Sequence, residues 1–136
     1  MNWKLIGTLA LSGVVMGVLS LFGLTRHGIE PTLWLLIALG SAFVISKRAP
    51  RLYFLHGLLV GVLIGVANGL VQVVGFDTYL AHNPEAAEAL AKSPGGADAR
   101  TLLLIASPLI GSAYGLVLGG IAFVFARSTR PKIPAR

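Results

Sequence analysis

A chain of 136 residues is short enough to form a single domain, residues 1–136. Only 12% of its residues are charged, against roughly 25% in soluble domains, and 55% are hydrophobic. This composition excludes a water-soluble globular protein, because too few polar side chains are present to cover its surface. The net charge of +6 does not indicate a nucleic-acid ligand, because the basic residues flank apolar runs instead of forming one patch. We expect the lipid bilayer, with its anionic head groups, to be their partner.

Four apolar runs predict an all-α, polytopic membrane protein with a bundle of four transmembrane helices. The first run, residues 5–24, carries no charge and is long enough to cross a hydrocarbon core of about 30 Å. The second, residues 31–46, is short and needs flanking residues to complete a crossing. The third covers residues 53–76. The fourth, residues 101–126, contains Pro108, which predicts a kink near its beginning.

Basic residues predict the orientation of these spans. Eight of them fall on one side: Lys4, Lys47, Arg48, Arg51, Arg127, Arg130, Lys132 and Arg136. Only three, Arg26, Lys92 and Arg100, fall on the other. The positive-inside rule therefore predicts that both termini lie in the cytoplasm. The single sizeable loop, residues 77–100, is then extracytoplasmic.

This loop contains the signals of one short amphipathic helix. Asn83 is a candidate N-cap, Pro84 follows at the first helical position, and Glu88 and Lys92 are spaced to pair across one turn. A turn signal at residues 93–96 ends this helix. Asp98 is a candidate cap for the fourth span.

Small residues at four-residue spacing mark three of the spans. Span three carries Gly57, Gly61, Gly65 and Gly69; span four carries Ser107, Gly111, Gly115 and Gly119; span one carries Gly13 and Gly17. Such rows form shallow grooves through which helix backbones approach closely in lipid. Two interpretations stay open. The rows pack spans three and four against each other, or against span one, within one bundle, or at least one row faces a second subunit.

Polar residues of span three lie on the glycine face. A helical wheel directs Asn68 and Gln72 into this packed face and away from lipid. They either form interhelical hydrogen bonds, with Ser107, Ser112 or Tyr114 as candidate partners, or provide a polar lining for a solute path. His56, near the cytoplasmic end, is expected to be a hydrogen-bonded interfacial residue and not a proton relay.

No chemistry of a catalytic or metal site is recognisable. The chain has no cysteine, and no span carries an acid, lysine or arginine in its interior. The spacing of His27, Glu30, Asp77, His82 and Glu85 matches no metal-ligand pattern, so we interpret them as solvated loop residues. We expect no catalytic residue, no cofactor and no metal, and hence no enzyme.

Parts of the chain resemble a known family. The segments are Tyr53 to Gly57, Phe76 to Leu80, Asn83 to Glu85 and Gly111 to Arg127. They resemble a family of small four-span bacterial membrane proteins of unknown function that is common in Bacteroidota. The resemblance implies a bacterial inner-membrane location. It implies no activity.

Two functional hypotheses follow. The first is a non-catalytic accessory, assembly or structural subunit of a membrane complex, or a homo-oligomer, which acts through glycine-lined helix packing and has a protein partner in the membrane. The alternative is a small oligomeric channel or carrier for a neutral solute, lined by Asn68 and Gln72. The lack of charge within the spans favours the first.

Overall fold

A computed structural model describes residues 1–25, 28–92 and 98–128. The sequence predictions for Arg26, for His27 and for the turn at residues 93–96 lie outside these ranges, as do those for Arg130, Lys132 and Arg136. The described residues form six helices. Four are long: α1 (Trp3–Leu21), α2 (Ile29–Arg48), α3 (Tyr53–Val74) and α6 (Ala99–Ser128). Two are short: α4 (Phe76–His82) and α5 (Pro84–Ala91).

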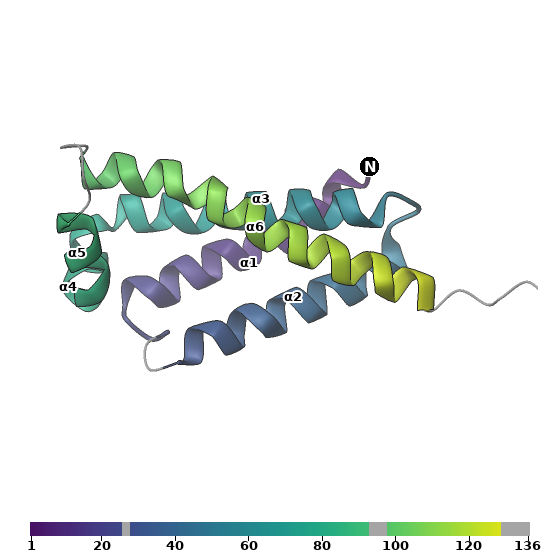
Figure 1. Ribbon diagram of the computed structural model, residues 1–136, viewed down its shortest axis with the longest axis horizontal. Helices are drawn as coiled ribbons and strands as arrows, with labels where there is room; N and C mark the ends of the chain where they lie inside the picture. The colour runs from purple at the N-terminus through teal and green to yellow at the C-terminus, as the bar shows by residue number, and fades with distance from the viewer. Residues whose placement is uncertain (26–27, 93–97, 129–136) are drawn as a thin grey trace, which may run out of the picture.

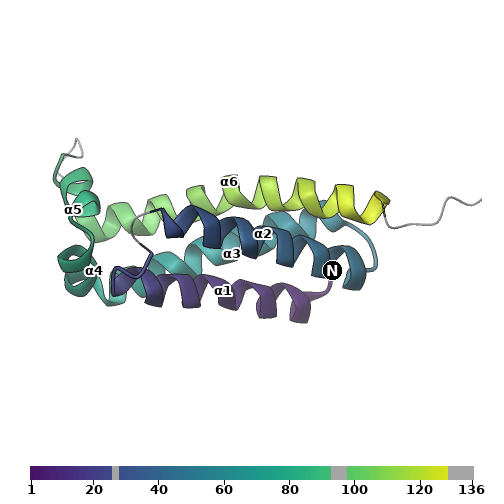
Figure 2. The same cartoon turned by 90° about the horizontal axis from the view of Figure 1, so that it is seen from below.

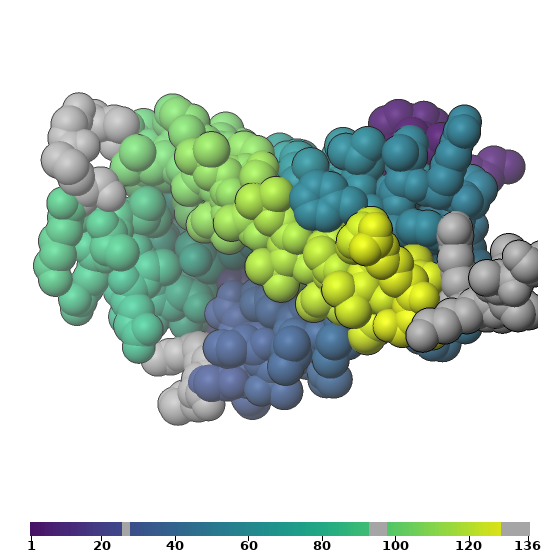
Figure 3. All heavy atoms as spheres, turned by 45° about the vertical axis from the view of Figure 1, so that its right-hand side comes forward, coloured from purple at the N-terminus to yellow at the C-terminus, as the bar shows by residue number. Residues whose placement is uncertain are grey.

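The four long helices are long and apolar enough to cross a membrane, which confirms the predicted all-α, multi-pass architecture. They lie roughly side by side, with α4 and α5 stacked across one end of the bundle (Figures 1 and 2). α3 is the central element, since it packs extensively against both α1 and α6, while α2 packs mainly against α6. α2 and α6 lie next to each other on the face shown in Figure 3.

Helix bounds differ from the predicted spans chiefly at the ends. The second helix is longer than its apolar run, because it includes Glu30 in its first turn and Lys47 and Arg48 in its last. An acid near a helix N-terminus and cations near its C-terminus complement the helix dipole. The short second span therefore gains the flanking residues that it needed. α6 continues as a helix through Pro108, so the proline does not interrupt the fourth span.

The loop between the third and fourth spans contains two short helices where one was predicted. α4 begins directly after Gly75, and α5 follows it across Asn83. Asn83 lies at the predicted N-cap position, but its side chain forms no capping hydrogen bond. The predicted pair of Lys92 with Glu88 is present at 3.3 Å. Asp98 caps α6 by accepting a hydrogen bond from the backbone N–H of Thr101 at 3.3 Å.

The apolar core lies toward the end of the bundle opposite α4 and α5. All four long helices contribute fully buried side chains to it, including Ile6, Ile45, Ile64 and Leu118. The outward faces carry most of the large apolar side chains, and many of these are exposed. This distribution suits a helix bundle whose surroundings are hydrocarbon instead of water.

Candidate functional site

The two long glycine rows meet each other inside the bundle. Gly57 lies against Gly119, Gly61 against Gly115, and Gly65 against Gly111. A Cβ atom added to Gly65 would be 2.6 Å from the Gly111 Cα, a separation that real Cβ atoms do not reach. The last member of the α3 row, Gly69, faces the Ser107 side chain. We call this α3–α6 contact the glycine seam. Both rows are used within one chain.

The shorter row of α1 packs on another side of α3. A Cβ atom on Gly13 would be 2.8 Å from the Ile64 Cα, and one on Gly17 would be 2.8 Å from the Val71 Cβ. The three rows together fix the α1–α3–α6 layer by backbone contact. In a membrane, where hydrocarbon gives helices little reason to associate, such close approach is a main source of association.

Gln72 is buried, with 8% of its surface exposed, and it hydrogen-bonds across to α1. Its Nε2 donates to the Ser20 hydroxyl at 3.4 Å. The three partners considered from the sequence instead donate to backbone carbonyls. Ser107 donates to the Leu103 carbonyl, Ser112 to the Pro108 carbonyl, and Tyr114 to the Trp34 carbonyl.

Asn68 lies on the same side of α3 but is only half-buried. Among the described residues, no hydrogen bond of its side chain is recorded, whereas its backbone carbonyl lies close to Gly17. The Gln72 side chain and the Asn68 backbone carbonyl thus lie on the α1 side of α3.

His56 is completely buried and ties the start of the chain to α3. Its Nε2 accepts a hydrogen bond from the backbone N–H of Asn2 at 3.0 Å. Its Nδ1 lies 3.0 Å from the Leu52 carbonyl, which has no proton to give, so Nδ1 is the donor. The two contacts specify a neutral imidazole with its proton on Nδ1. His56 is therefore hydrogen-bonded as expected, but in the interior and not at an exposed interface.

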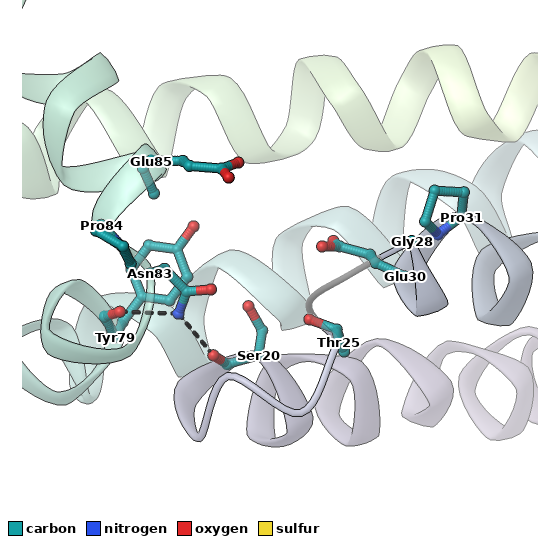
Figure 4. Close-up of a pocket in the computed structure, with 10 residues that line it drawn as sticks. Ser20, Thr25, Gly28, Glu30, Pro31, Tyr79, Asn83, Pro84 and Glu85 are labelled. Atoms are coloured by element: carbon teal, nitrogen blue, oxygen red, sulfur yellow. Dashed lines mark hydrogen bonds between the residues drawn. The ribbon is translucent and has the colours of Figure 1, made fainter.

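A polar cleft of about 400 Å³ opens at the end of the bundle that carries α4 and α5. Its walls come from the end of α1, the start of α2, and the junction of α4 with α5 (Figure 4). The polar side chains that line it are Ser20, Thr25, Glu30, Tyr79, Asn83 and Glu85. Glu30 and Glu85, which the sequence indicates as solvated loop residues, both line this cleft.

Asn83 holds this cleft in place. Its Nδ2 donates to the Ser20 carbonyl and to the Tyr79 carbonyl, each at 2.8 Å. The first contact gives the Ser20 carbonyl, at the end of α1, a second donor beside the backbone N–H of Gly23 at 3.0 Å. Because both N–H donors are engaged, the amide oxygen is left facing the cleft (Figure 4).

The cleft is rich in hydrogen-bond acceptors. Glu30 and Glu85 direct their carboxylates toward it from opposite walls, and the Tyr79 hydroxyl points into it (Figure 4). Burial and the negative charge of Glu30 raise the pKa of Tyr79 above its usual value, which keeps this phenol protonated. None of the described lining residues is basic.

The other polar residues of this end have separate roles. Asp77 forms an ion pair with Arg100 at 3.7 Å, and His82 contacts the Phe22 ring with centroids 6.4 Å apart. Within the described part of the chain, no three His, Cys, Asp or Glu side chains come together as a metal site would require. The arrangement can bind a cation through acceptor oxygens, but the described residues form no acid–base pair directed at a nucleophile.

Comparisons with known proteins add no further constraint. No protein-family model, no curated protein and no solved structure matches this chain.

Proposed function

We propose that the protein is a non-catalytic accessory, assembly or structural subunit of a membrane complex in a bacterial inner membrane, with both termini in the cytoplasm. It docks on another membrane protein or on a second copy of itself. The glycine seam supports the structural part of this proposal, and the exposed face of α2 supports the docking part. The seam brings α3 and α6 together backbone to backbone over several turns, so the interior of the bundle serves packing.

The glycine seam restricts which surfaces of the bundle can dock on a partner. Because the two long rows are filled within one chain, a partner cannot use them without opening the bundle. Docking must then involve outward faces. α2 is the best candidate, since it is the least buried of the four long helices, with 28% of its apolar window buried against 33–39% in the others.

An open glycine lies in the middle of this outward face. Gly40 has no atom within 4 Å of the position that a Cβ would take. Exposed Leu36 and Phe43 lie one turn before and almost one turn after it. The three residues form a small notch between apolar side chains, a shape that allows the close approach of another helix.

A channel or carrier for a neutral solute receives less support from this geometry. Gln72 is engaged with Ser20, and Asn68 lies beside the α1 contact, so the two polar residues do not frame a passage through one chain.

The experiment compares two open glycines. Gly40→Ile fills the notch on α2, and Gly120→Ile is the matched control, since Gly120 on α6 also has nothing within 4 Å of its Cβ position. Both variants should fold. In mild detergent, native mass spectrometry should show an assembly larger than one chain for the wild type and the control, and its loss in Gly40→Ile. A wild type that is monomeric and without a partner, both in detergent and in native membrane extracts, would refute the proposal.

A further inference from the structure

The polar cleft at the α4–α5 end has a composition that the packing of the bundle does not require. Its lining oxygens come from two stretches that are far apart in the sequence: Ser20, Thr25 and Glu30, between the end of α1 and the first turn of α2, and Tyr79, Asn83 and Glu85, at the α4–α5 junction. In Figure 4 these side chains point into one space. We infer that this cleft is a binding site for a ligand that carries a primary ammonium group.

Charge is the first argument. Glu30 and Glu85 belong to the first turns of α2 and α5, where each carboxylate complements a helix N-terminus. A helix N-terminus carries roughly half a positive charge, so two helix ends offset about one of the two negative charges. Glu30 and Glu85 are the charged groups among the described lining residues, and none of those residues is basic. A cation in the cleft would interact favourably with both carboxylates.

Hydrogen-bonding capacity is the second argument. The Asn83 amide is fixed by its two donors, which leaves only its oxygen for the cleft. The Ser20 hydroxyl already accepts from Gln72, and the two carboxylates accept without donating. An ammonium group, with three donors and a positive charge, can donate to these oxygens, whereas the two carboxylates would repel an anion.

Thr25 gives an independent indication of a ligand. Only 2% of its surface is exposed, yet its hydroxyl forms no hydrogen bond with another described residue. Among the described residues, every fully enclosed side-chain nitrogen or oxygen has a hydrogen-bond partner. The Thr25 hydroxyl, which has none among these residues, must therefore border the open cleft. Figure 4 shows it directed toward the cleft. A buried hydroxyl without a protein partner is a position at which a ligand or water completes the hydrogen bonding.

Size separates an organic cation from a bare metal ion. A space of about 400 Å³ falls within the range of small-molecule pockets, roughly 300–1,000 Å³. Ca²⁺ needs several oxygens at about 2.3–2.6 Å on all sides, which a cleft of this width does not provide. The ammonium group has two natural sources, a free amine in solution or the head group of phosphatidylethanolamine in the surrounding bilayer.

Trp34 provides a built-in reporter for the test. Its indole Nε1 donates to a Glu30 carboxylate oxygen at 3.2 Å, so a cation at Glu30 alters the environment of the indole. The chain has two tryptophans, and Trp3→Phe removes the other. This variant in phosphatidylcholine nanodiscs is titrated with ethanolamine, and with choline as the matched cation that has no N–H donor.

We expect a saturable change in Trp34 fluorescence with ethanolamine and at least tenfold weaker binding of choline. Glu30→Gln and Glu85→Gln should each weaken ethanolamine binding about tenfold, since each removes a charge-assisted hydrogen bond. Glu88→Gln is the control: Glu88 lies on the same short helix but pairs with Lys92 outside the cleft, and its loss should leave binding unchanged. Replacing the nanodisc lipid with phosphatidylethanolamine identifies the source. If phosphatidylethanolamine in the nanodisc weakens the binding of free ethanolamine, the lipid head group is the ligand. If the binding of free ethanolamine is unchanged, the ligand is a free amine.

Three results would overturn the inference: no saturable response, equal binding of choline, or binding that survives both glutamine substitutions. Arg26 follows Thr25 in the sequence, so Arg26→Gln is tested as well. If ethanolamine binds only to that variant, Arg26 itself occupies the cleft beside Glu30 and Glu85 in the wild type. That result would also overturn the inference.

Discussion

Gly65 of α3 and Gly111 of α6 contact each other through their backbones, and no side chain separates the two helices at this point. A Cβ on Gly65 would be 2.6 Å from the Gly111 Cα, and a Cβ on Gly111 would be 2.9 Å from the Gly65 Cα. The backbone of each glycine therefore leaves no room for a side chain at the position of the other. One turn away, a Cβ on Gly61 would meet the backbone of Gly115, and a Cβ on Gly115 would meet the backbone of Leu58.

Replacing either glycine by alanine should destabilise the bundle. Gly65→Ala inserts a methyl group where backbone atoms lie, and overpacking of this kind costs about 1–3 kcal/mol. Gly40→Ala is the control, because its Cβ meets open space, and alanine gains up to about 1 kcal/mol of helix propensity over glycine. Unfolding by SDS in mixed micelles measures both. Equal stabilities of the two variants would show that the seam is not a rigid contact.

The spans and the small-residue rows can be predicted from the sequence, but the pairing of the rows cannot. The spans are predictable because hydrocarbon accepts only long apolar helices, and the composition of the chain leaves few other possibilities. The glycine rows indicate close approach, but not whether the partner is the same chain or another. Only the three-dimensional pairing of Gly57 with Gly119 and of Gly61 with Gly115 places both rows in one bundle.

The ends of the helices and the polar cleft were harder to predict. Glu30, Lys47 and Arg48 lie outside the apolar run, yet they belong to α2, because the last turns of a span extend beyond hydrocarbon. The cleft depends on a contact between Ser20 and Asn83, which are 63 residues apart. Asn83 followed by Pro84 is a sound capping signal, but its side-chain amide donates to the Ser20 and Tyr79 carbonyls instead, and only the fold brings Ser20 within its reach.

The buried His56 should be important for stability. His56→Phe keeps an aromatic ring of similar width but leaves the Asn2 N–H without its acceptor, and it removes a second hydrogen bond to the Leu52 carbonyl. An unsatisfied buried donor costs about 1–3 kcal/mol. His82→Phe is the matched control, because His82 is exposed and bonds only within its own helix. Its stability should change by less than about 0.5 kcal/mol.

The tautomer of His56 gives a second, independent measurement. Nitrogen-15 chemical shifts of the imidazole distinguish a protonated Nδ1 from a protonated Nε2. We expect the proton on Nδ1, because Nε2 accepts from Asn2. A proton on Nε2 at neutral pH would mean that the N-terminus does not contact α3 in this way.

The contact between Gln72 and Ser20 should be weak but specific. At 3.4 Å it is a long hydrogen bond, and interhelical hydrogen bonds in membranes contribute about 0.6 kcal/mol on average. A double-mutant cycle with Gln72→Leu and Ser20→Ala should give a coupling energy of about this size or less. The cycle of Asn68→Leu with Ser20→Ala should give none, since no hydrogen bond joins Asn68 to Ser20. Larger coupling in the second cycle would contradict the assignment of Gln72 as the partner.

Tyr79 predicts a pH dependence at the alkaline end. Its pKa is raised above 10.0, first by burial and second by the charge of Glu30, so the folded protein holds the phenolic proton more tightly than the unfolded chain. The stability from this group is complete below the unfolded pKa of about 10 and is lost as the pH rises through the raised folded value. Phenolate absorbance of the wild type, minus that of Tyr79→Phe, isolates this titration. Glu30→Gln should lower the Tyr79 pKa relative to the wild type, while burial still keeps it raised, and Glu88→Gln should not change it. A Tyr79 that titrates at its ordinary value in the wild type would mean that the cleft is open to water and that Glu30 does not face it.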